Sequence, residues 1–189
     1  MAGLNKRTFQ RIRVPLGFIF AVVFVVFSRP TPLMLLVGGT VAVIGLAIRA
    51  WASGHIQKAK VLATSGPYGY TRNPLYLGSF VLGVGFTIAA GVWWLALIFV
   101  ALYLGIYLPV MRVESGTMAQ LFGDDFRAYA NAVPLFFPRL TPFRSGSEES
   151  AGFDSSLYLR YREYQAAIGL VVAWTVLALK ALYLGLLIK

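Results

Sequence analysis

The sequence predicts an all-α integral membrane protein with about five transmembrane helices. Its 189 residues are 58% hydrophobic and only 13% charged, a composition far too apolar for a soluble domain of this size. Five apolar runs approach, with their flanks, the ~20 residues that a bilayer core requires. They cover residues 14–28, 33–52, 74–90, 92–110 and 164–188. We therefore expect residues 1–189 to form one multi-pass membrane domain.

The basic residues are distributed asymmetrically around these runs. Four precede the first run, and six lie between the fourth and fifth. Four more are Arg49, near the end of the second run, and Lys58, Lys60 and Arg72, which follow it before the third; Arg29, Lys180 and Lys189 lie elsewhere. Because loops rich in Lys and Arg stay in the cytoplasm, this bias predicts that the amino terminus and segments 54–73 and 112–158 are cytoplasmic. No small-x-small cleavage site follows the first run, which indicates a retained anchor. The basic residues form no single patch, so nucleic-acid binding is not expected.

Small residues spaced four apart predict helix contacts within the membrane. Gly38 and Ala42 lie on one face of the second run, and Ser79, Gly83 and Thr87 lie on one face of the third. Such faces allow two helices to approach closely, and a lipid-facing position is the alternative for Gly38 and Ala42. The same spacing recurs in the last run at Gly169 with Ala173 and at Ala181 with Gly185. These patterns favour a packed bundle.

Two segments after the fourth run are polar. Residues 112–133 repeat apolar side chains at helical spacing among acids and amides, which predicts an amphipathic helix. Gly123 followed by Asp124 favours the end of one helix and the cap of the next, so we expect two pieces rather than one rod. Residues 134–156 are rich in Pro, Ser, Gly and charge, and 145–150 have the composition of a mobile linker.

Polar residues gather densely only in 60–76 and 112–129, both on the predicted cytoplasmic side. The third and fourth runs form a hairpin with a turn near Gly91, which brings 72–76 beside 112–114. The sequence therefore predicts a shared pocket at the cytoplasmic ends of these helices. The chain has no Cys and a single His, so a thiolate nucleophile is excluded and no metal site is expected.

Three short motifs occur in these two segments. They are Gly66-Pro67-Tyr68, Arg72-Asn73-Pro74-Leu75-Tyr76-Leu77-Gly78, and Glu114 followed by Phe122-Gly123. Together they resemble the isoprenylcysteine carboxyl methyltransferase and phospholipid methyltransferase superfamily. That family carries a Gly-Pro-Tyr turn, an Arg-His-Pro-x-Tyr-x-Gly motif that opens a membrane helix, and a Glu-Glu pair eight residues before Phe-Gly. The resemblance covers roughly residues 60–138 and agrees in order and spacing.

The sequence also departs from the family pattern at four positions. Asn73 stands where the family commonly has His, and Ser115 stands where it has the second Glu. Lys60 lies near a position often filled by His, and Gly69 replaces a usual polar residue. Asn still donates and accepts hydrogen bonds, so Asn73 is a mild change. The loss of a carboxylate at Ser115 is the departure that bears most on cofactor binding.

The resemblance implies S-adenosylmethionine as the cofactor, held in the cytoplasmic-face pocket. Glu114 can accept from the amino group of this cofactor, Arg72 can bind its carboxylate, and Tyr68 or Tyr76 can stack on its cationic or aromatic parts. Arg72, Asn73 and Glu114 are the predicted catalytic residues. The predicted cofactor-binding residues are Leu62, Gly66, Pro67, Tyr68, Arg72, Asn73, Tyr76, Gly78 and Glu114. An interfacial anchor for Arg72 and a solvated or Arg112-paired carboxylate for Glu114 are the structural alternatives.

A lipophilic methyl acceptor is expected because a site at helix ends opens sideways to lipid. Basic residues outnumber acids near it, which favours a prenylcysteine-like carboxylate, and Arg127 and Tyr129 are the candidate substrate contacts. Two alternatives stay open. One is N-methylation of a phospholipid amine, and the other is a non-catalytic lipid-binding scaffold, which Gly69 and Ser115 motivate. The sequence does not indicate an oligomeric state.

Overall fold

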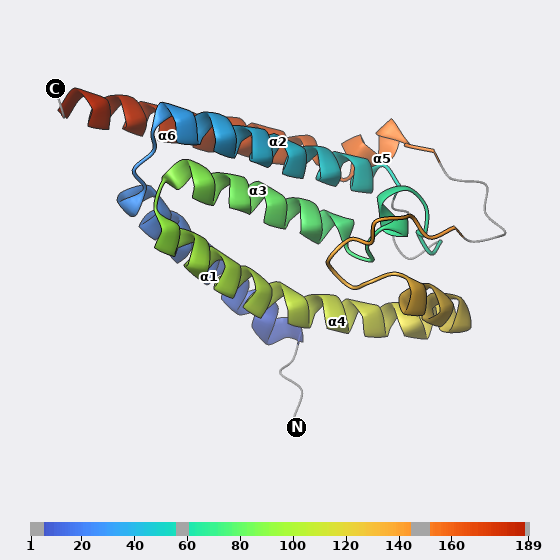
Figure 1. Cartoon of the computed structure of the whole chain (residues 1–189). Coiled ribbons are helices and arrows are strands. Elements are labelled where there is room, and N and C mark those ends of the chain that lie inside the picture. Colours follow the sequence, from blue (N-terminus) through green and yellow to red (C-terminus); the bar gives the residue numbers. More distant parts are fainter. Residues whose placement is uncertain (1–5, 56–60, 145–151, 188–189) are drawn as a thin grey trace.

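The computed structural model describes residues 6–55, 61–144 and 152–187, and every regular element in these ranges is helical (Figure 1). The elements are α1 (Lys6–Phe27), α2 (Pro32–Ser53), the short 3-10 helix η1 (Gly66–Gly69), α3 (Pro74–Ala90), α4 (Trp93–Ala132), α5 (Ser155–Arg160) and α6 (Tyr164–Leu187). The all-α prediction is confirmed. Residues 145–150, predicted to be a linker, lie outside the described residues.

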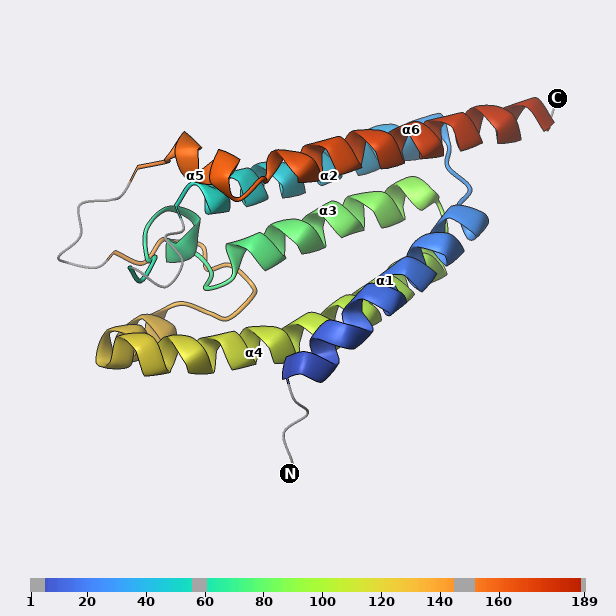
Figure 2. The ribbon, with the colours of Figure 1, turned by 180° about the vertical axis from the view of Figure 1, so that it is seen from behind.

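Three of the described helices, α2, α4 and α6, are long and apolar enough to cross a membrane. The apolar part of α1 (Pro15–Phe27) and α3 (Pro74–Ala90) are shorter, so the count of five spans stays a prediction. Consecutive helices along the chain, α1, α2, α3, α4 and α6, alternate in direction, and α3 lies between α2 and α4 in both views (Figures 1 and 2). Segment 61–73 and the residues around α5 consequently lie at one end of the bundle, opposite the carboxyl terminus.

Local sequence signals fix the ends of these helices. Thr31 caps α2 by accepting a hydrogen bond from the backbone N–H of Met34 at 3.3 Å. Gly91, with φ of 68°, ends α3 in the left-handed conformation that glycine adopts at low cost. Gly123 is non-helical, with φ of 55° and ψ of −125°, so α4 consists of two helical pieces as predicted. The first piece continues from Trp93 past residue 110 as far as Gly123.

Glycine contacts bring α2 and α3 together. A Cβ atom on Gly45 would lie 2.3 Å from the backbone N of Leu82, and one on Gly85 would lie 2.5 Å from that of Ala42. Gly38 and Gly85 would likewise clash with each other's backbone, and Ala42 is fully buried. Because these contacts are between backbones, the helices can only lie this close with no side chain between them. The predicted packing of Gly38 and Ala42 is therefore confirmed, and their lipid-facing alternative is wrong.

The other faces of the bundle are joined by larger side chains. Gly83 of α3 faces α4, where the ring of Phe99 lies 2.2 Å from a Cβ built on this glycine. Trp174 of α6 packs on Gly39 of α2. Lys180 of α6 donates from Nζ to the carbonyl oxygens at the end of α1, including that of Val26 at 2.9 Å.

The glycines predicted to pack in the last run, unlike those of α2, do not contact a neighbouring helix among the residues that the structure describes. Gly169 and Gly185 are exposed, and no atom of another element lies within 4 Å of a Cβ built on either. These two glycines therefore make no helix contact within the described part of the chain.

Candidate functional site

The turn around η1 is the centre of the polar end of the bundle. Gly66 has φ of 58°, and a Cβ there would lie 2.5 Å from the ring of His55, so this position favours glycine on two grounds. Pro67 follows at the start of the 3-10 helix, and Tyr68 is only 6% exposed. The Gly-Pro-Tyr motif therefore builds a tight turn that directs the Tyr68 ring into the protein.

A second segment, residues 134–143, binds this turn along its length. The backbone N–H of Arg72 donates to Pro134 at 3.0 Å, and the Asn73 side chain donates from Nδ2 to Leu135 at 2.9 Å. The buried Thr71 hydroxyl donates to the carbonyl of Phe136 at 2.9 Å. Two further backbone bonds run from Arg139 to Tyr70 at 2.9 Å and from Phe143 to Gly69 at 2.8 Å. Segment 134–143 thus supports the turn, although its composition predicts only a loop.

Glu114 and Tyr76 meet as the hairpin prediction requires. The Tyr76 hydroxyl donates to Oε1 of Glu114 at 3.1 Å, which joins the start of α3 to α4. The hydroxyl of Tyr103 donates to the backbone carbonyl of Tyr76 at 2.7 Å. The Tyr103 ring in turn stacks on Tyr107, with centroids 4.4 Å apart. Tyr76 therefore links the carboxylate of Glu114 to an aromatic cluster that includes Tyr103 and Tyr107 of α4.

Arg72 and Tyr68 have buried polar atoms without hydrogen-bond partners. The Nε atom of Arg72 and the hydroxyl oxygen of Tyr68 are both inaccessible and unpaired. Burial lowers the pKa of Arg72, an effect that nearby Tyr129 partly offsets, and burial raises the pKa of Tyr68. Buried polar groups are normally paired, so unpaired ones at a suspected site indicate the place of a missing acceptor. The donor chemistry fits the carboxylate of an amino-acid ligand.

The remaining predicted residues occupy three different environments. Leu62 packs against the buried cluster of Phe126, Tyr129 and Val133. Tyr129 is only 3% exposed and donates from its hydroxyl to the backbone carbonyl of Tyr68 at 2.8 Å, so it fixes the turn. Arg127 is exposed and forms an ion pair with Asp124 at 2.9 Å.

Gly78 faces α2. A Cβ on Gly78 would lie 2.7 Å from Cγ of Arg49 and 2.8 Å from the carbonyl oxygen of Gly45. The last residue of the Arg-x-Pro-x-Tyr-x-Gly motif therefore leaves room for α2 and for the Arg49 side chain. Residues 72, 73, 76 and 114 gather around the start of α3, and this glycine lies on the α2 side of the same helix.

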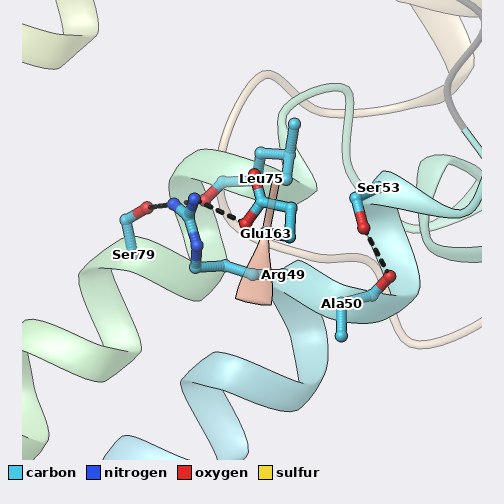
Figure 3. Close-up of polar contacts among 6 residues, drawn as sticks. All are labelled: Arg49, Ala50, Ser53, Leu75, Ser79 and Glu163. Carbon is cyan, nitrogen blue, oxygen red and sulfur yellow. Dashed lines mark hydrogen bonds and ion pairs between the residues drawn. The ribbon is translucent and has the colours of Figure 1, made fainter. Parts of the chain in front are cut away.

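Sequence reasoning missed a partly buried ion pair beside this helix. Arg49 of α2 reaches Glu163, just ahead of α6, with Nη2 and Oε2 2.7 Å apart, and its other terminal nitrogen donates to Ser79 of α3 (Figure 3). The sequence pattern predicts for Arg49 only a part in the positive-inside bias. The sequence does contain a signal for this ion pair. Arg49 lies four residues before the end of one apolar helix, and Glu163 lies directly before the start of another.

No group of three or more His, Cys, Asp or Glu side chains that could hold a metal ion occurs among the residues that the structure describes.

These features define a helical membrane protein whose polar site lies where a turn, the start of α3 and the polar part of α4 meet. The chain belongs to the phospholipid methyltransferase family, whose model matches residues 31–125. The match contains η1, the motif at the start of α3, and Glu114, but neither segment 134–143 nor Glu163. Family membership confirms the resemblance stated from the motifs.

Two curated relatives match parts of the chain. The nickel-cobalt-cadmium resistance protein NccN of Alcaligenes xylosoxydans xylosoxydans is 37% identical over 114 residues, which are 59% of this chain and 52% of the relative. The cobalt-zinc-cadmium resistance protein CzcN of Cupriavidus metallidurans is 34% identical over 146 residues, 71% of this chain and 65% of the relative. The chain thus spans between about half and two thirds of the length of these relatives. No solved structure matches the chain.

Proposed function

We propose that this protein transfers a methyl group from S-adenosylmethionine to a lipophilic acceptor in the membrane. The observation that carries the proposal is the pair of buried, unpartnered donors on Arg72 and Tyr68, at the end of the bundle where Tyr76 holds Glu114. Membership of the phospholipid methyltransferase family supports the reaction type. When bound, S-adenosylmethionine supplies a methyl group that its sulfonium has already activated.

Each site residue then has a defined task. The guanidinium of Arg72 and the hydroxyl of Tyr68 bind the carboxylate of the cofactor, which satisfies both buried donors. Glu114 accepts a hydrogen bond from the amino group of the cofactor, and its Oε1 atom is already oriented by Tyr76. Asn73 acts indirectly, because its Nδ2 is engaged by the carbonyl of Leu135 and so holds the turn in place. Holding two reactants in line can supply about 7 to 11 kcal/mol of the barrier. A carboxylate acceptor is already ionised, so its methylation requires no catalytic base.

Binding of the cofactor is tested by calorimetric titration of the protein in detergent. We expect S-adenosylmethionine to bind the parent, and Glu114→Ala to raise Kd by roughly tenfold or more, since hydrogen bonds to charged groups are worth about 1.5 to 3 kcal/mol. Asp124→Ala is the matched control, because this carboxylate is exposed and pairs only with the exposed Arg127 among the ion pairs described. A parent that binds no cofactor, or equal Kd values for all three proteins, contradicts the proposal.

The acceptor we favour is a lipid that carries a carboxylate, as a prenylcysteine does. Arg127 of α4 and Arg160 of α5 are exposed, and Arg139 lies on segment 134–143, so cations are available to orient an anion. The second candidate is a phospholipid amine, which the description of the matching family model favours.

The two acceptors can be separated by the chemistry of their products. The protein is incubated with methyl-labelled cofactor and either a synthetic farnesylcysteine analogue or phosphatidylethanolamine vesicles. A methyl ester releases labelled methanol in alkali, whereas an N-methyl group does not. Because both curated relatives are named for metal resistance, lipids from cells grown with cobalt, nickel or cadmium form a third acceptor pool. Cofactor binding without transfer to any pool would favour a non-catalytic lipid-binding scaffold.

A further inference from the structure

Arg49 and Glu163 form a largely shielded ion pair next to the candidate site. Their side chains are 24% and 13% exposed, and the facing Nη2 and Oε2 atoms lie 2.7 Å apart (Figure 3). The other terminal nitrogen of Arg49 donates to the hydroxyl of Ser79, which itself donates to the carbonyl of Leu75 at 2.8 Å. One guanidinium thereby connects three helices, α2, α3 and the start of α6.

The chain adopts a strained turn to place Glu163 there. Arg162, the residue before it, has φ of 55°, and it is the single non-glycine residue with positive φ among those described. A side chain in this conformation is strained, and such strain persists only where the surroundings hold it. Before α5, which leads into this turn, Asp154 caps the helix and donates from its backbone N–H to the carbonyl oxygen of Gly54 at 3.0 Å. The segment from Asp154 to Glu163 is therefore fixed against the end of α2.

The Arg49–Glu163 ion pair and Glu114 both contact the first two turns of α3, from opposite sides. On the side facing α4, Tyr76 donates to Glu114 at 3.1 Å. On the side facing α2, Ser79 receives the hydrogen bond from Arg49, and Gly78 leaves room for the Arg49 stem. The start of α3 is thus held from two sides. Glu114 binds it directly through Tyr76, and Glu163 binds it indirectly through the guanidinium of Arg49.

We propose that Arg49 and Glu163 are positioning residues for methyl transfer, through which α6 fixes the first two turns of α3 and so the Tyr76–Glu114 contact. This inference rests on the proposed function and assigns a role to α6. Neither Glu163 nor α6 lies within the part of the chain that the family model matches. The charge of Glu163 also reaches the buried Tyr68, where it adds to the rise in pKa that burial causes.

A set of three variants separates positioning from simple support of the fold. Glu163→Gln removes the negative charge of the pair. The positive charge of Arg49 is then shielded from water without a partner, which destabilises the folded protein. Arg49→Met with Glu163→Met replaces the pair by apolar side chains, an exchange that is often neutral or stabilising for the fold. Asp124→Asn breaks the exposed pair with Arg127, whose side chains are 92% and 72% exposed, and serves as the control.

Two measurements are made on the detergent-solubilised protein. Hydrogen exchange follows the backbone amides from Leu75 to Ser79 without ligand, and calorimetric titration gives Kd for S-adenosylmethionine. We expect faster exchange in Glu163→Gln and roughly tenfold weaker cofactor binding in both Glu163→Gln and the double variant, because residues in one network couple strongly. The double variant should nevertheless melt at the temperature of the parent, and Asp124→Asn should match the parent throughout.

The outcomes decide separately on the two proposals. Parent-like Kd in the double variant shows that the pair only supports the fold, and this overturns the positioning role. Unchanged exchange at Leu75 to Ser79 in Glu163→Gln overturns it as well. A parent that binds no S-adenosylmethionine contradicts the proposed function, and the exchange data alone then decide whether Glu163 holds α3.

Discussion

Arg72→Met is expected to weaken S-adenosylmethionine binding by roughly 10- to 150-fold, the equivalent of one charge-assisted hydrogen bond, without lowering the melting temperature. The first effect follows from the loss of the guanidinium. The second follows from the free protein, in which Nε of Arg72 is buried without a hydrogen-bond partner. Removing an unsatisfied buried donor costs the fold no hydrogen bond, and methionine preserves most of the stem. The backbone bond from residue 72 to Pro134 is unaffected.

The measurements are calorimetric titration and thermal unfolding in the same detergent. Arg144→Met is the matched control, because Arg144 is exposed and lies beyond the segment that supports the turn. A large fall in melting temperature for Arg72→Met would identify Arg72 as a structural anchor instead. Unchanged affinity would remove it from the cofactor site.

Gly45→Ala is expected to destabilise the protein by about 1 to 3 kcal/mol or more, although alanine is the better helix former. The added Cβ would lie 2.3 Å from the backbone N of Leu82 and 2.7 Å from the carbonyl oxygen of Gly78. Both are backbone atoms, so α2 and α3 must move apart to relieve the contact. Since α3 carries Tyr76 and Gly78, the same displacement should weaken cofactor binding.

Gly105→Ala is the matched comparison for this prediction. Gly105 lies within α4, and a Cβ built on it meets nothing within 4 Å, so the substitution should stabilise by roughly 0.5 to 1 kcal/mol. Both variants gain the same helix propensity from the change of glycine to alanine. The difference between their melting temperatures therefore measures the cost of the clash between α2 and α3. Equal melting temperatures for the two variants would contradict the close α2–α3 contact.

Much of the site could be predicted from the sequence because it depends on local signals and one hairpin. Pro74 and Gly91 delimit α3, and a hairpin between adjacent apolar runs brings Tyr76 to Glu114. Gly123 was predicted to divide the following helix and does so. These features involve residues close in the chain or related by one turn, so helix periodicity and turn chemistry are sufficient.

The partners that were missed are distant in sequence. Leu135 binds Asn73 across 62 positions, and Glu163 binds Arg49 across 114. A proline-rich segment such as 134–143 has no periodicity to reveal that its carbonyl groups accept from a turn. A lone carboxylate ahead of an apolar run gives no indication of which arginine it will meet.

The sequence by itself determined the all-helical class, the family and the residues at the start of α3, because apolar length, glycine and proline act on the neighbouring backbone. Only the tertiary structure decided how that helix is held. Gly78 faces α2, Tyr129 supports Tyr68, and Arg49 joins α3 to Glu163. Such choices depend on which helix faces come together, and side-chain packing and pairing of buried charges set them only when the whole bundle has assembled.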